Sequence, residues 1–265
     1  MEQILPFCRS NIKNFEFKLF HDKIEKCPKL VFNFNNAKVK ISENLQSEKY
    51  IIFGKYQEKY VVACETDKIS NDFHHIMGKY FSKFEDLRTL AGIGYALINW
   101  DKETKYCGKC GKILKFSKKE NVAKICSSCN TTYFPRLNPA IIVAVIKDKT
   151  HVLVTRKPEW KGNRYGLIAG FIEYGENIEE TAKREITEET GIKVKNIKYI
   201  SSQFWPFPYQ IMIGLTAEYE SGYINIDNKE LCEAKWLNIK NISEEILPPP
   251  SSIARFLFEF IIKMT

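Results

Sequence analysis

The sequence predicts an α+β protein with an N-terminal β-rich region, a small cysteine-rich module and a C-terminal α/β/α sandwich. Three observations lead to this fold class. Short strand-like runs fill the N-terminal part, two C-x-x-C pairs lie in the middle, and strand-like runs flank one acidic helical stretch near residue 180. At 265 residues the chain is long enough for two domains and an insert. We expect domains at 1–103, 104–135 and 136–265.

The N-terminal region reads as β structure followed by a helix. Four strand-like runs cover 29–34, 37–41, 48–54 and 58–65, with turns expected at Asn35-Asn36 and Gly54-Lys55. The adjacent pair His74-His75 could ligate a metal, but neighbouring side chains on a helix point apart, so a structural role is favoured. From Phe84 to about Asp101 the apolar spacing becomes helical.

Four of the eight cysteines follow a metal-binding pattern. Cys107, Cys110, Cys126 and Cys129 form C-x2-C-x15-C-x2-C, which is typical of a zinc ribbon. Four thiolates leave no open coordination position, so this zinc is expected to be structural; a redox pair would need only one C-x-x-C. We expect small residues inside the pairs to permit the turns around sulfur (Gly108, Ser127, Ser128), and ordinary thiols at the scattered cysteines (Cys8, Cys27, Cys64, Cys232).

The ribbon and the whole chain are basic. The net charge is +8, which suits an anionic partner such as a nucleotide or RNA, although a lysine-rich composition gives the same balance without one. The ribbon lysines can be read either as a nucleic-acid surface or as a solvated one (Lys109, Lys112, Lys115, Lys118, Lys119). No signal peptide and no apolar run of membrane-spanning length is apparent, so we expect a cytoplasmic protein without a membrane segment.

The C-terminal region alternates strands with two helices. Strands are expected at 140–146, 151–157 and 167–171, then to about 203, at 211–220 and at 231–239, with a turn at Asp148-Lys149. A last helix is expected after a cap at Ser251 or Ser252. Its apolar stripe comprises Ile253, Leu257, Phe260 and Ile261.

The stretch from Gly170 to Ile192 holds the acidic helix, expected over 176–190. Glu185, Glu188 and Glu189 are spaced i, i+3 and i+4, which places three carboxylates on one helix face. Such a cluster favours a divalent cation, Mg²⁺ or Mn²⁺, over the alternative of a solvated acidic face. Arg184 lies two turns after Glu176 and could hold it by a bidentate salt bridge.

Two glycines bracket this stretch. Gly170 is expected to let the preceding loop turn tightly beside the metal. Gly191 is expected to end the helix in a left-handed conformation.

The order of residues in this stretch is that of the Nudix box, G-x5-E-x7-R-E-U-x-E-E-x-G-U, with every defined position filled. Together with the ribbon and SQFWPFP at 202–208, it resembles the NADH pyrophosphatases of the Nudix superfamily, bacterial enzymes also described as NAD-capped RNA hydrolases. The resemblance covers roughly 84–265 and implies a Nudix fold and a homodimer. It also implies hydrolysis of NAD(H) to NMN(H) and AMP, and release of NMN from NAD-capped RNA with a 5′-monophosphate end left.

The resemblance also implies roles for particular residues. Catalytic positions are Glu176, Arg184, Glu185, Glu188 and Glu189, with the general base left open. Ligands of Mg²⁺ or Mn²⁺ are the Ala169 carbonyl, Glu185, Glu188, Glu189 and Glu230, with Glu233 as the less suitable alternative to Glu230. Substrate contacts are Arg88, Glu120, Phe134, Gln203, Phe204, Trp205, Pro206, Phe207, Pro208, Tyr209, Gln210 and Ala254.

Two positions depart from the family pattern, and two other functions remain open. Phe204 replaces the family's proline and Phe134 replaces its tyrosine. The first alternative is a Nudix hydrolase of another nucleoside diphosphate derivative, such as ADP-ribose or a dinucleoside polyphosphate. The second is a zinc-ribbon protein that binds nucleic acid and uses the Nudix fold only as a scaffold.

Overall fold

The computed structural model contains two compact units, which we describe separately. One comprises Pro6–Leu137 with Trp205–Tyr209, and the other comprises chiefly Asn138–Phe204 with Gln210–Thr265. The structure describes residues 12, 15–20, 27–45, 47, 49–68, 70–77, 83–120, 122–160, 162–226 and 230–264. Cys8 lies outside these ranges. No helix among them is both long enough and apolar enough to cross a membrane.

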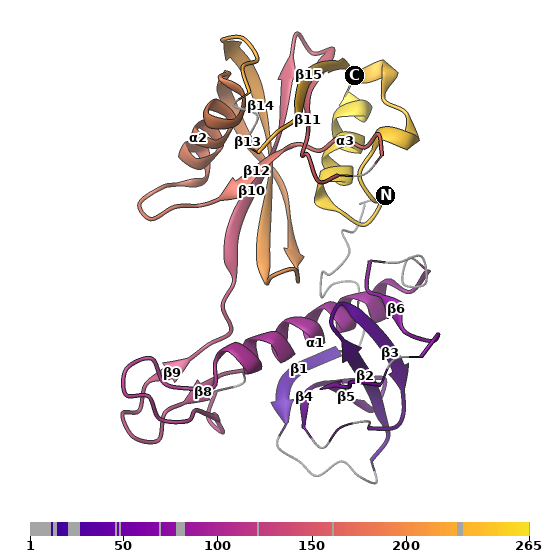
Figure 1. Cartoon of the computed structure of the whole chain (residues 1–265), viewed down its shortest axis with the longest axis vertical. Helices are drawn as coiled ribbons and strands as arrows, with labels where there is room; N and C mark the ends of the chain where they lie inside the picture. The colour runs from indigo at the N-terminus through magenta and orange to yellow at the C-terminus, as the bar shows by residue number, and fades with distance from the viewer. Residues whose placement is uncertain are drawn as a thin grey trace. The chain divides into compact units, whose positions relative to one another are not determined.

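A six-stranded sheet forms the larger part of the N-terminal unit (Figure 1). Its order is β1-β4-β5-β2-β3-β6, with β2 and β5 parallel and the other pairs antiparallel. The strands are β1 (Phe15–Phe20), β2 (Lys29–Asn35), β3 (Lys38–Ser42), β4 (Tyr50–Tyr56), β5 (Lys59–Glu65) and β6 (His74–His75). The four predicted strands correspond to β2 to β5.

One local prediction for this sheet was wrong. Gly54 does not turn the chain; it lies inside β4, where a Cβ atom would come within 2.3 Å of the Phe15 ring and 2.6 Å of the Glu16 carbonyl oxygen. The turn follows at Gln57 and Glu58, both with positive φ. His74-His75 forms the short strand β6, which pairs with β3, and adjacent side chains on a strand also point to opposite faces.

Helix α1 (Glu85–Glu103) packs against β2, β4 and β5. Its close approach depends on Gly94, where a Cβ atom would already lie 3.2 to 3.3 Å from side-chain atoms of Ala63, Phe53 and Phe34. The predicted helix from Phe84 to about Asp101 is therefore confirmed, with two more residues at its C-terminal end.

The cysteine module follows α1 as a three-stranded antiparallel sheet. It comprises β7 (Lys115–Phe116), β8 (Lys124–Ile125) and β9 (Thr132–Tyr133). Lys124 fastens it to the end of α1: its buried amine donates to the carbonyl oxygens of Asp101 and Thr104, at 3.0 and 2.6 Å. It also pairs with the Asp101 carboxylate at 2.6 Å. A cation is favoured here because the carbonyls at a helix C-terminus carry partial negative charge.

The C-terminal unit is built on a mixed sheet ordered β13-β14-β10-β11-β15, with β12 also paired to β10. Its strands are β10 (Asn138–Lys147), β11 (His151–Arg156), β12 (Ile168–Phe171), β13 (Lys193–Trp205), β14 (Gln210–Ser221) and β15 (Glu233–Asn238). The central pair, β10 and β14, is parallel, whereas β12 runs antiparallel to β10. Asp148 and Lys149 form the predicted turn, both with positive φ.

Helices α2 (Ile178–Thr190) and α3 (Ile253–Met264) cover opposite faces of this sheet, which confirms the predicted α/β/α sandwich (Figure 1). Ala182 and Ile186 of α2 join the core formed by β10, β11 and β14. On α3 the predicted stripe is right except for one position, because Phe258 is fully buried and Phe260 only half-buried. Ser252 caps α3 by accepting a hydrogen bond from the Arg255 N–H at 3.3 Å.

Candidate active site and metal centre

The acidic helix α2 is fixed at both ends by its own sequence. At its N-terminus Asn177 and Glu180 form a reciprocal capping box, with both hydrogen bonds at 2.9 Å. At its C-terminus Gly191 adopts φ 71°, the predicted left-handed cap. The helix begins two residues later than expected because Glu176 and Asn177 precede it. Both ends of the helix that carries the glutamates are therefore held in place.

Arg184 binds Glu176 through two hydrogen bonds. Its Nε lies 2.6 Å from Oε1 and its Nη2 lies 2.9 Å from Oε2 of Glu176, which is the bidentate geometry expected from their spacing. Glu176 accepts two further bonds, from the Glu173 N–H and the Thr181 hydroxyl. These partners, Arg184 foremost, lower the pKa of Glu176 to about 2, so the carboxylate stays charged at neutral pH.

The same guanidinium also contacts the acidic face. Nη1 donates to Glu185 at 2.8 Å and to Glu188 at 3.2 Å, and Nη2 donates to the carbonyl oxygen of Phe171 at 3.0 Å. Arg184 thus connects the end of β12 to the helix and partly offsets the repulsion between neighbouring carboxylates. Glu189 is the most buried of the three predicted ligands on the helix, with 7% of its surface exposed.

Glu185 is accommodated by the absence of a side chain at Gly170. A Cβ atom at Gly170 would lie 1.9 Å from the carboxyl carbon of Glu185. Gly170 is therefore needed for space and not for a turn, because it lies within β12, paired with Ile141. Burial raises the pKa of Glu185, and the nearby charges of Glu188 and Glu230 raise it further, while Arg184 opposes them. A carboxylate in this environment is suited to binding a cation.

Of the two candidate distant glutamates, Glu230 is better placed. It is exposed, and its charge acts on Glu185. Glu233 is engaged elsewhere: Arg156, Tyr165 and Lys235 contact its carboxylate at 3.3, 2.9 and 2.8 Å. These partners, Lys235 foremost, lower the pKa of Glu233.

The donor set suits Mg²⁺ or Mn²⁺, although the carboxylates do not form a closed cage. The donors are hard oxygens from Glu185, Glu188, Glu189 and Glu230, and Ala169 adjoins Gly170 in β12. Among the described residues, only the four ribbon cysteines form a group of three or more potential ligands whose atoms all lie within 4.8 Å of one another. In this structure the carboxylates of Glu185 and Glu188 bind the guanidinium of Arg184.

The four ribbon cysteines form a preorganised metal centre. Three of their Sγ pairs lie 3.4 to 3.7 Å apart. A zinc ion with Zn–S bonds of about 2.3 Å needs sulfur atoms spaced by about 3.8 Å, so the cluster fits tetrahedral zinc. No disulfide joins the seven described cysteines.

The two halves of the zinc centre have the same backbone design. In each, the first cysteine's carbonyl oxygen accepts from the residue four positions later, Gly111 or Asn130. Both of these residues have positive φ, 70° and 55°. The turns therefore depend on them and not, as predicted, on Gly108, Ser127 and Ser128. Tyr133 is a further member of this centre that no sequence pattern marks: its hydroxyl lies 3.2 Å from the Cys107 sulfur and accepts from the Gly108 N–H.

The candidate substrate segment 203–210 is distributed over both units. Gln203 is fully buried in the C-terminal unit, where its amide donates to the Ser251 carbonyl oxygen and accepts from the Ile253 N–H, at 3.1 and 2.8 Å. This brings Gln203 next to Ala254, another predicted contact. Phe204 is half-buried in the same unit, and Gln210 begins β14.

Trp205 to Tyr209 belong to the N-terminal unit. Phe207 packs between Trp205 and Tyr95, with ring centroids 5.8 and 5.2 Å away, and His75 lies 6.3 Å from it. Pro206 is buried and Pro208 exposed. The Tyr209 hydroxyl bonds Glu103 of α1, and burial raises the pKa of Tyr209 to about 12. Tyr95 and Glu103 were missed because nothing in their local sequence marks them as partners of this segment.

The remaining predicted contacts also lie in the N-terminal unit. Arg88 is buried within α1, and its Nε has no hydrogen-bond partner among the described residues. Burial lowers the pKa of its guanidinium. Glu120 and Phe134 are both exposed on the ribbon.

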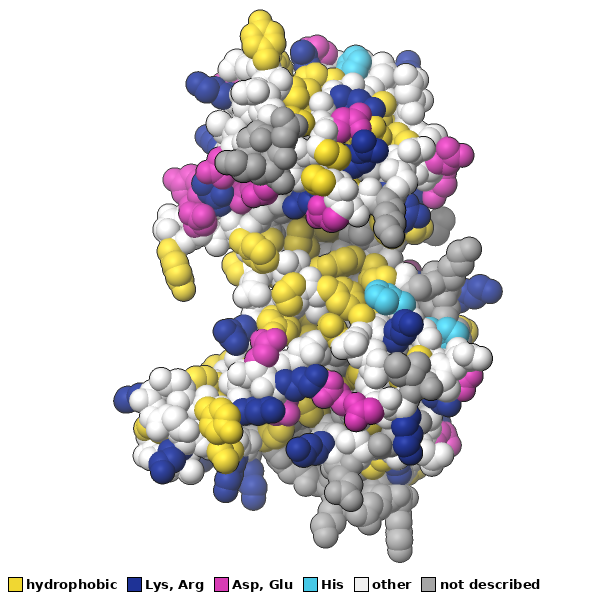
Figure 2. All heavy atoms as spheres, in the orientation of Figure 1, with side chains coloured by type: hydrophobic (Ala, Val, Ile, Leu, Met, Phe, Trp, Pro, Cys, Tyr) yellow, Lys and Arg dark blue, Asp and Glu magenta, His cyan; other side chains and the backbone are white. Residues whose placement is uncertain are grey.

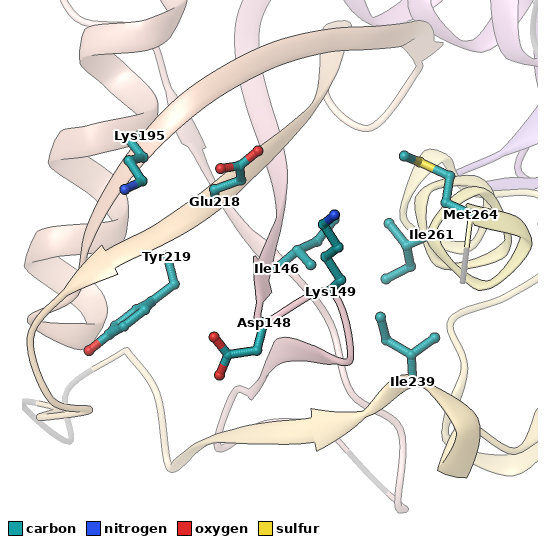
Figure 3. Close-up of a pocket in the computed structure, with 9 residues that line it drawn as sticks. All are labelled: Ile146, Asp148, Lys149, Lys195, Glu218, Tyr219, Ile239, Ile261 and Met264. Atoms are coloured by element: carbon teal, nitrogen blue, oxygen red, sulfur yellow. The ribbon is translucent and has the colours of Figure 1, made fainter.

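The acidic face of α2 and the pocket shown in Figure 3 lie near opposite ends of strand β10. Gly170 pairs near the start of that strand, whereas Ile146 at its end lines the pocket, which has a volume of about 550 Å³. Asp148, Lys149, Lys195 and Glu218 line it as well, so its charges are balanced (Figure 3). No predicted site residue lines this pocket.

Comparison with known proteins identifies the family of the C-terminal domain. The sequence profile of the NUDIX domain matches residues 136–257. Two proteins named NAD-capped RNA hydrolase NudC, from Escherichia coli strains SMS-3-5 and CFT073, are each 43% identical to this chain over 175 residues. The alignment covers 66% of this chain and 66% of each relative, so the chain spans slightly less than two thirds of their length.

Solved structures with the same domain were also found. A NUDIX hydrolase from Nitrosomonas europaea is 23% identical, with a TM-score of 0.46, and covers 59% of this chain and 90% of its own. The NUDIX domain of Shewanella oneidensis NrtR, solved with ADP ribose, is 17% identical, with a TM-score of 0.42, and covers 50% of this chain and 91% of its own.

Gly170→Ala tests the role of the space beside Glu185. The added methyl group should displace the Glu185 carboxylate, lower kcat about a hundredfold through misplacement, and cost about 1–3 kcal/mol of stability through overpacking. The turnover rate measures the loss in kcat, and urea unfolding measures the loss in stability. In a Glu185→Ala background the same change should cost little stability. An equal cost in both backgrounds would show that the clash lies elsewhere.

The Glu176–Arg184 pair gives a prediction about pH. Because the pKa of Glu176 is lowered to about 2 from an ordinary value of 4.5, the charged carboxylate stabilises the folded state above pH 4.5. That contribution is lost as the pH falls toward 2. The stability difference between the wild type and Glu176→Gln should therefore be constant from about pH 6 to 8 and shrink below about pH 4.5. Urea unfolding without divalent metal measures this stability difference. A difference that grows on acidification would contradict the lowered pKa of Glu176.

The ribbon predicts bound zinc. The purified protein should contain about one zinc ion per chain, and Cys126→Ser should remove most of it and lower the unfolding temperature. Cys232→Ser is the matched control, because this exposed cysteine lies outside the ribbon. Atomic absorption measures the zinc content of the wild type and of both variants. Equal zinc loss in both variants, or none bound by the wild type, would refute the site.

Proposed function

Because this chain belongs to the Nudix hydrolase family, with its domain at residues 136–257, we propose that it hydrolyses the diphosphate of NAD(H) to NMN(H) and AMP. We propose the same reaction on NAD-capped RNA, which releases NMN and leaves a 5′-monophosphate end. The observation that carries the proposal is the complete Nudix box on α2, in which Arg184 holds Glu176 and contacts Glu185 and Glu188. The 43% identity to hydrolases of NAD-capped RNA supports the substrate.

The chain's own groups perform three tasks in this proposal. Arg184 fixes Glu176, so that the loop before α2 and the acidic face keep one geometry. The carboxylates of Glu185, Glu188, Glu189 and Glu230, with the carbonyl oxygen of Ala169, hold Mg²⁺ or Mn²⁺. When bound, this ion offsets the charge of the diphosphate and activates water for attack on phosphorus.

The third task is recognition of the dinucleotide. Trp205 and Phe207 present aromatic faces of the kind that stack on bases, and their edge-to-face contact keeps the two rings mutually oriented. Gln203 fixes the start of this segment to the N-terminus of α3, beside Ala254. Arg88, whose buried Nε has no partner among the described residues, suits the negatively charged phosphate side of the substrate.

The ribbon zinc has a structural role in this proposal, since four cysteines fill its coordination shell. The seven described cysteines form no disulfide, which suits a reducing compartment and supports a cytoplasmic location. Homodimerisation follows from the family resemblance and is part of the same proposal.

Glu189→Gln provides the decisive test. In the presence of Mg²⁺ or Mn²⁺ the wild type should convert NADH to NMNH and AMP, and the variant should lose at least about a hundredfold in kcat with an unchanged unfolding temperature. Glu179→Gln, an exposed glutamate in the first turn of the same helix, is the control and should keep full activity.

A substrate panel completes this experiment. NADH, NAD⁺, NAD-capped RNA, ADP-ribose and a dinucleoside polyphosphate are compared with each metal. Faster turnover of ADP-ribose or the dinucleoside polyphosphate would replace the proposed substrate with another of the Nudix type. Full activity of Glu189→Gln would refute the assigned catalytic centre.

A further inference from the structure

Most of the net charge of the chain is concentrated in the ribbon. Residues 104–135 contain seven Lys and one Glu, whereas the whole chain contains 40 Lys or Arg and 32 Asp or Glu. This segment therefore contributes +6 of the total +8. A zinc ion held by four thiolates subtracts two of these charges and leaves the segment strongly basic.

The ribbon lysines are directed to solvent and lack acidic partners. Six of them are exposed, and none forms a salt bridge with any described residue: Lys105, Lys109, Lys112, Lys115, Lys118 and Lys119. Lys124 is the exception, because it is buried and serves to attach the ribbon to α1. Elsewhere, half-buried lysines such as Lys40 and Lys59 pair with carboxylates. The lysines of the ribbon thus leave a positive surface uncompensated.

Flat and apolar side chains lie exposed within this basic surface. Tyr106 and Ile113 face each other across an antiparallel bridge, with 64% and 65% of their surfaces accessible. Phe134 is 57% accessible on the same module. On the face seen in Figure 2, Lys and Arg side chains surround exposed hydrophobic ones over the ribbon. Exposed aromatics among unpaired lysines are the combination used to bind single strands, since bases stack on the rings while phosphates pair with cations.

We propose that this ribbon surface binds the RNA strand of capped substrates, with Tyr106 stacking on a base and Lys109, Lys112 and Lys115 contacting phosphates. The inference rests on the proposed function, because only a substrate with an RNA body would use such a surface. A single strand fits better than a duplex or an acidic protein. Its bases are open to stacking on Tyr106, whereas those of a duplex are already stacked on each other.

The test measures RNA binding separately from catalysis. A fluorescent single-stranded RNA of about 20 nucleotides with a 5′-monophosphate is titrated without divalent metal, from about 50 to 200 mM KCl. The ribbon variant carries Lys109→Gln, Lys112→Gln and Lys115→Gln. The control variant carries Lys193→Gln, Lys195→Gln and Lys198→Gln, three exposed lysines of β13. Zinc content and unfolding temperature establish that each variant is folded.

The ribbon variant should bind RNA at least about tenfold more weakly, and the slope of log K against log salt should decrease by about 2, as loss of three phosphate contacts requires. The control should match the wild type. Tyr106→Ala should weaken binding about tenfold with an unchanged salt slope, because stacking carries no charge. An excess of polyglutamate should compete poorly with RNA. Equal binding by ribbon and control variants, or equal competition by polyglutamate, overturns the inference.

Turnover separates this inference from the proposed function. On NADH the ribbon variant should keep the wild-type kcat/KM, whereas on NAD-capped RNA its KM should rise about tenfold. NADH turnover with no difference in RNA binding would reject the ribbon surface and leave the proposed reaction intact. Ribbon-dependent RNA binding without hydrolysis of either substrate would support the surface and reject the reaction.

Discussion

The acidic face of α2 depends on compensation of its negative charge by one guanidinium. Arg184 contacts Glu176, Glu185 and Glu188 and the carbonyl oxygen of Phe171. Carboxylates three and four residues apart on a helix repel one another, and burial of Glu185 adds a desolvation penalty. The fork geometry of arginine allows one side chain to satisfy several of these acceptors at once, which the single ammonium group of lysine would do less well.

The rest of the C-terminal unit supports this arrangement. The capping box at Asn177 and the left-handed Gly191 set the ends of the helix, and Ala182 and Ile186 bury its other face against the sheet. Strand β12 contributes the space at Gly170 and the Phe171 carbonyl oxygen. Glu185, Glu188 and Glu189 are thus positioned by a capped helix packed on the sheet and by a paired strand. Such positioning is what metal-dependent chemistry requires.

Sequence reasoning succeeded where a pattern had a physical period or a fixed spacing. The strand runs, the helix around 180, the bidentate pair and the four-cysteine cluster all follow from local rules of geometry, and the structure contains them. It failed where the reason for a residue lies in a distant neighbour. The local sequence of Gly54 predicts a turn, whereas its actual role is to leave space for the Phe15 ring. Gly170 has the sequence context of a loop glycine, and only the contact with the Glu185 side chain explains it. Likewise, no residue near Lys124 in the sequence indicates that its amine binds the end of α1.

The anchoring of Lys124 has a consequence for regulation by metal supply. Lys124 bonds Asp101 and Thr104, while Glu103 between them bonds Tyr209 of the aromatic segment. A ribbon that lost its zinc would release Lys124, loosen the last turn of α1 and thereby disturb Tyr209. Zinc starvation would therefore reach the aromatic segment through the end of a helix.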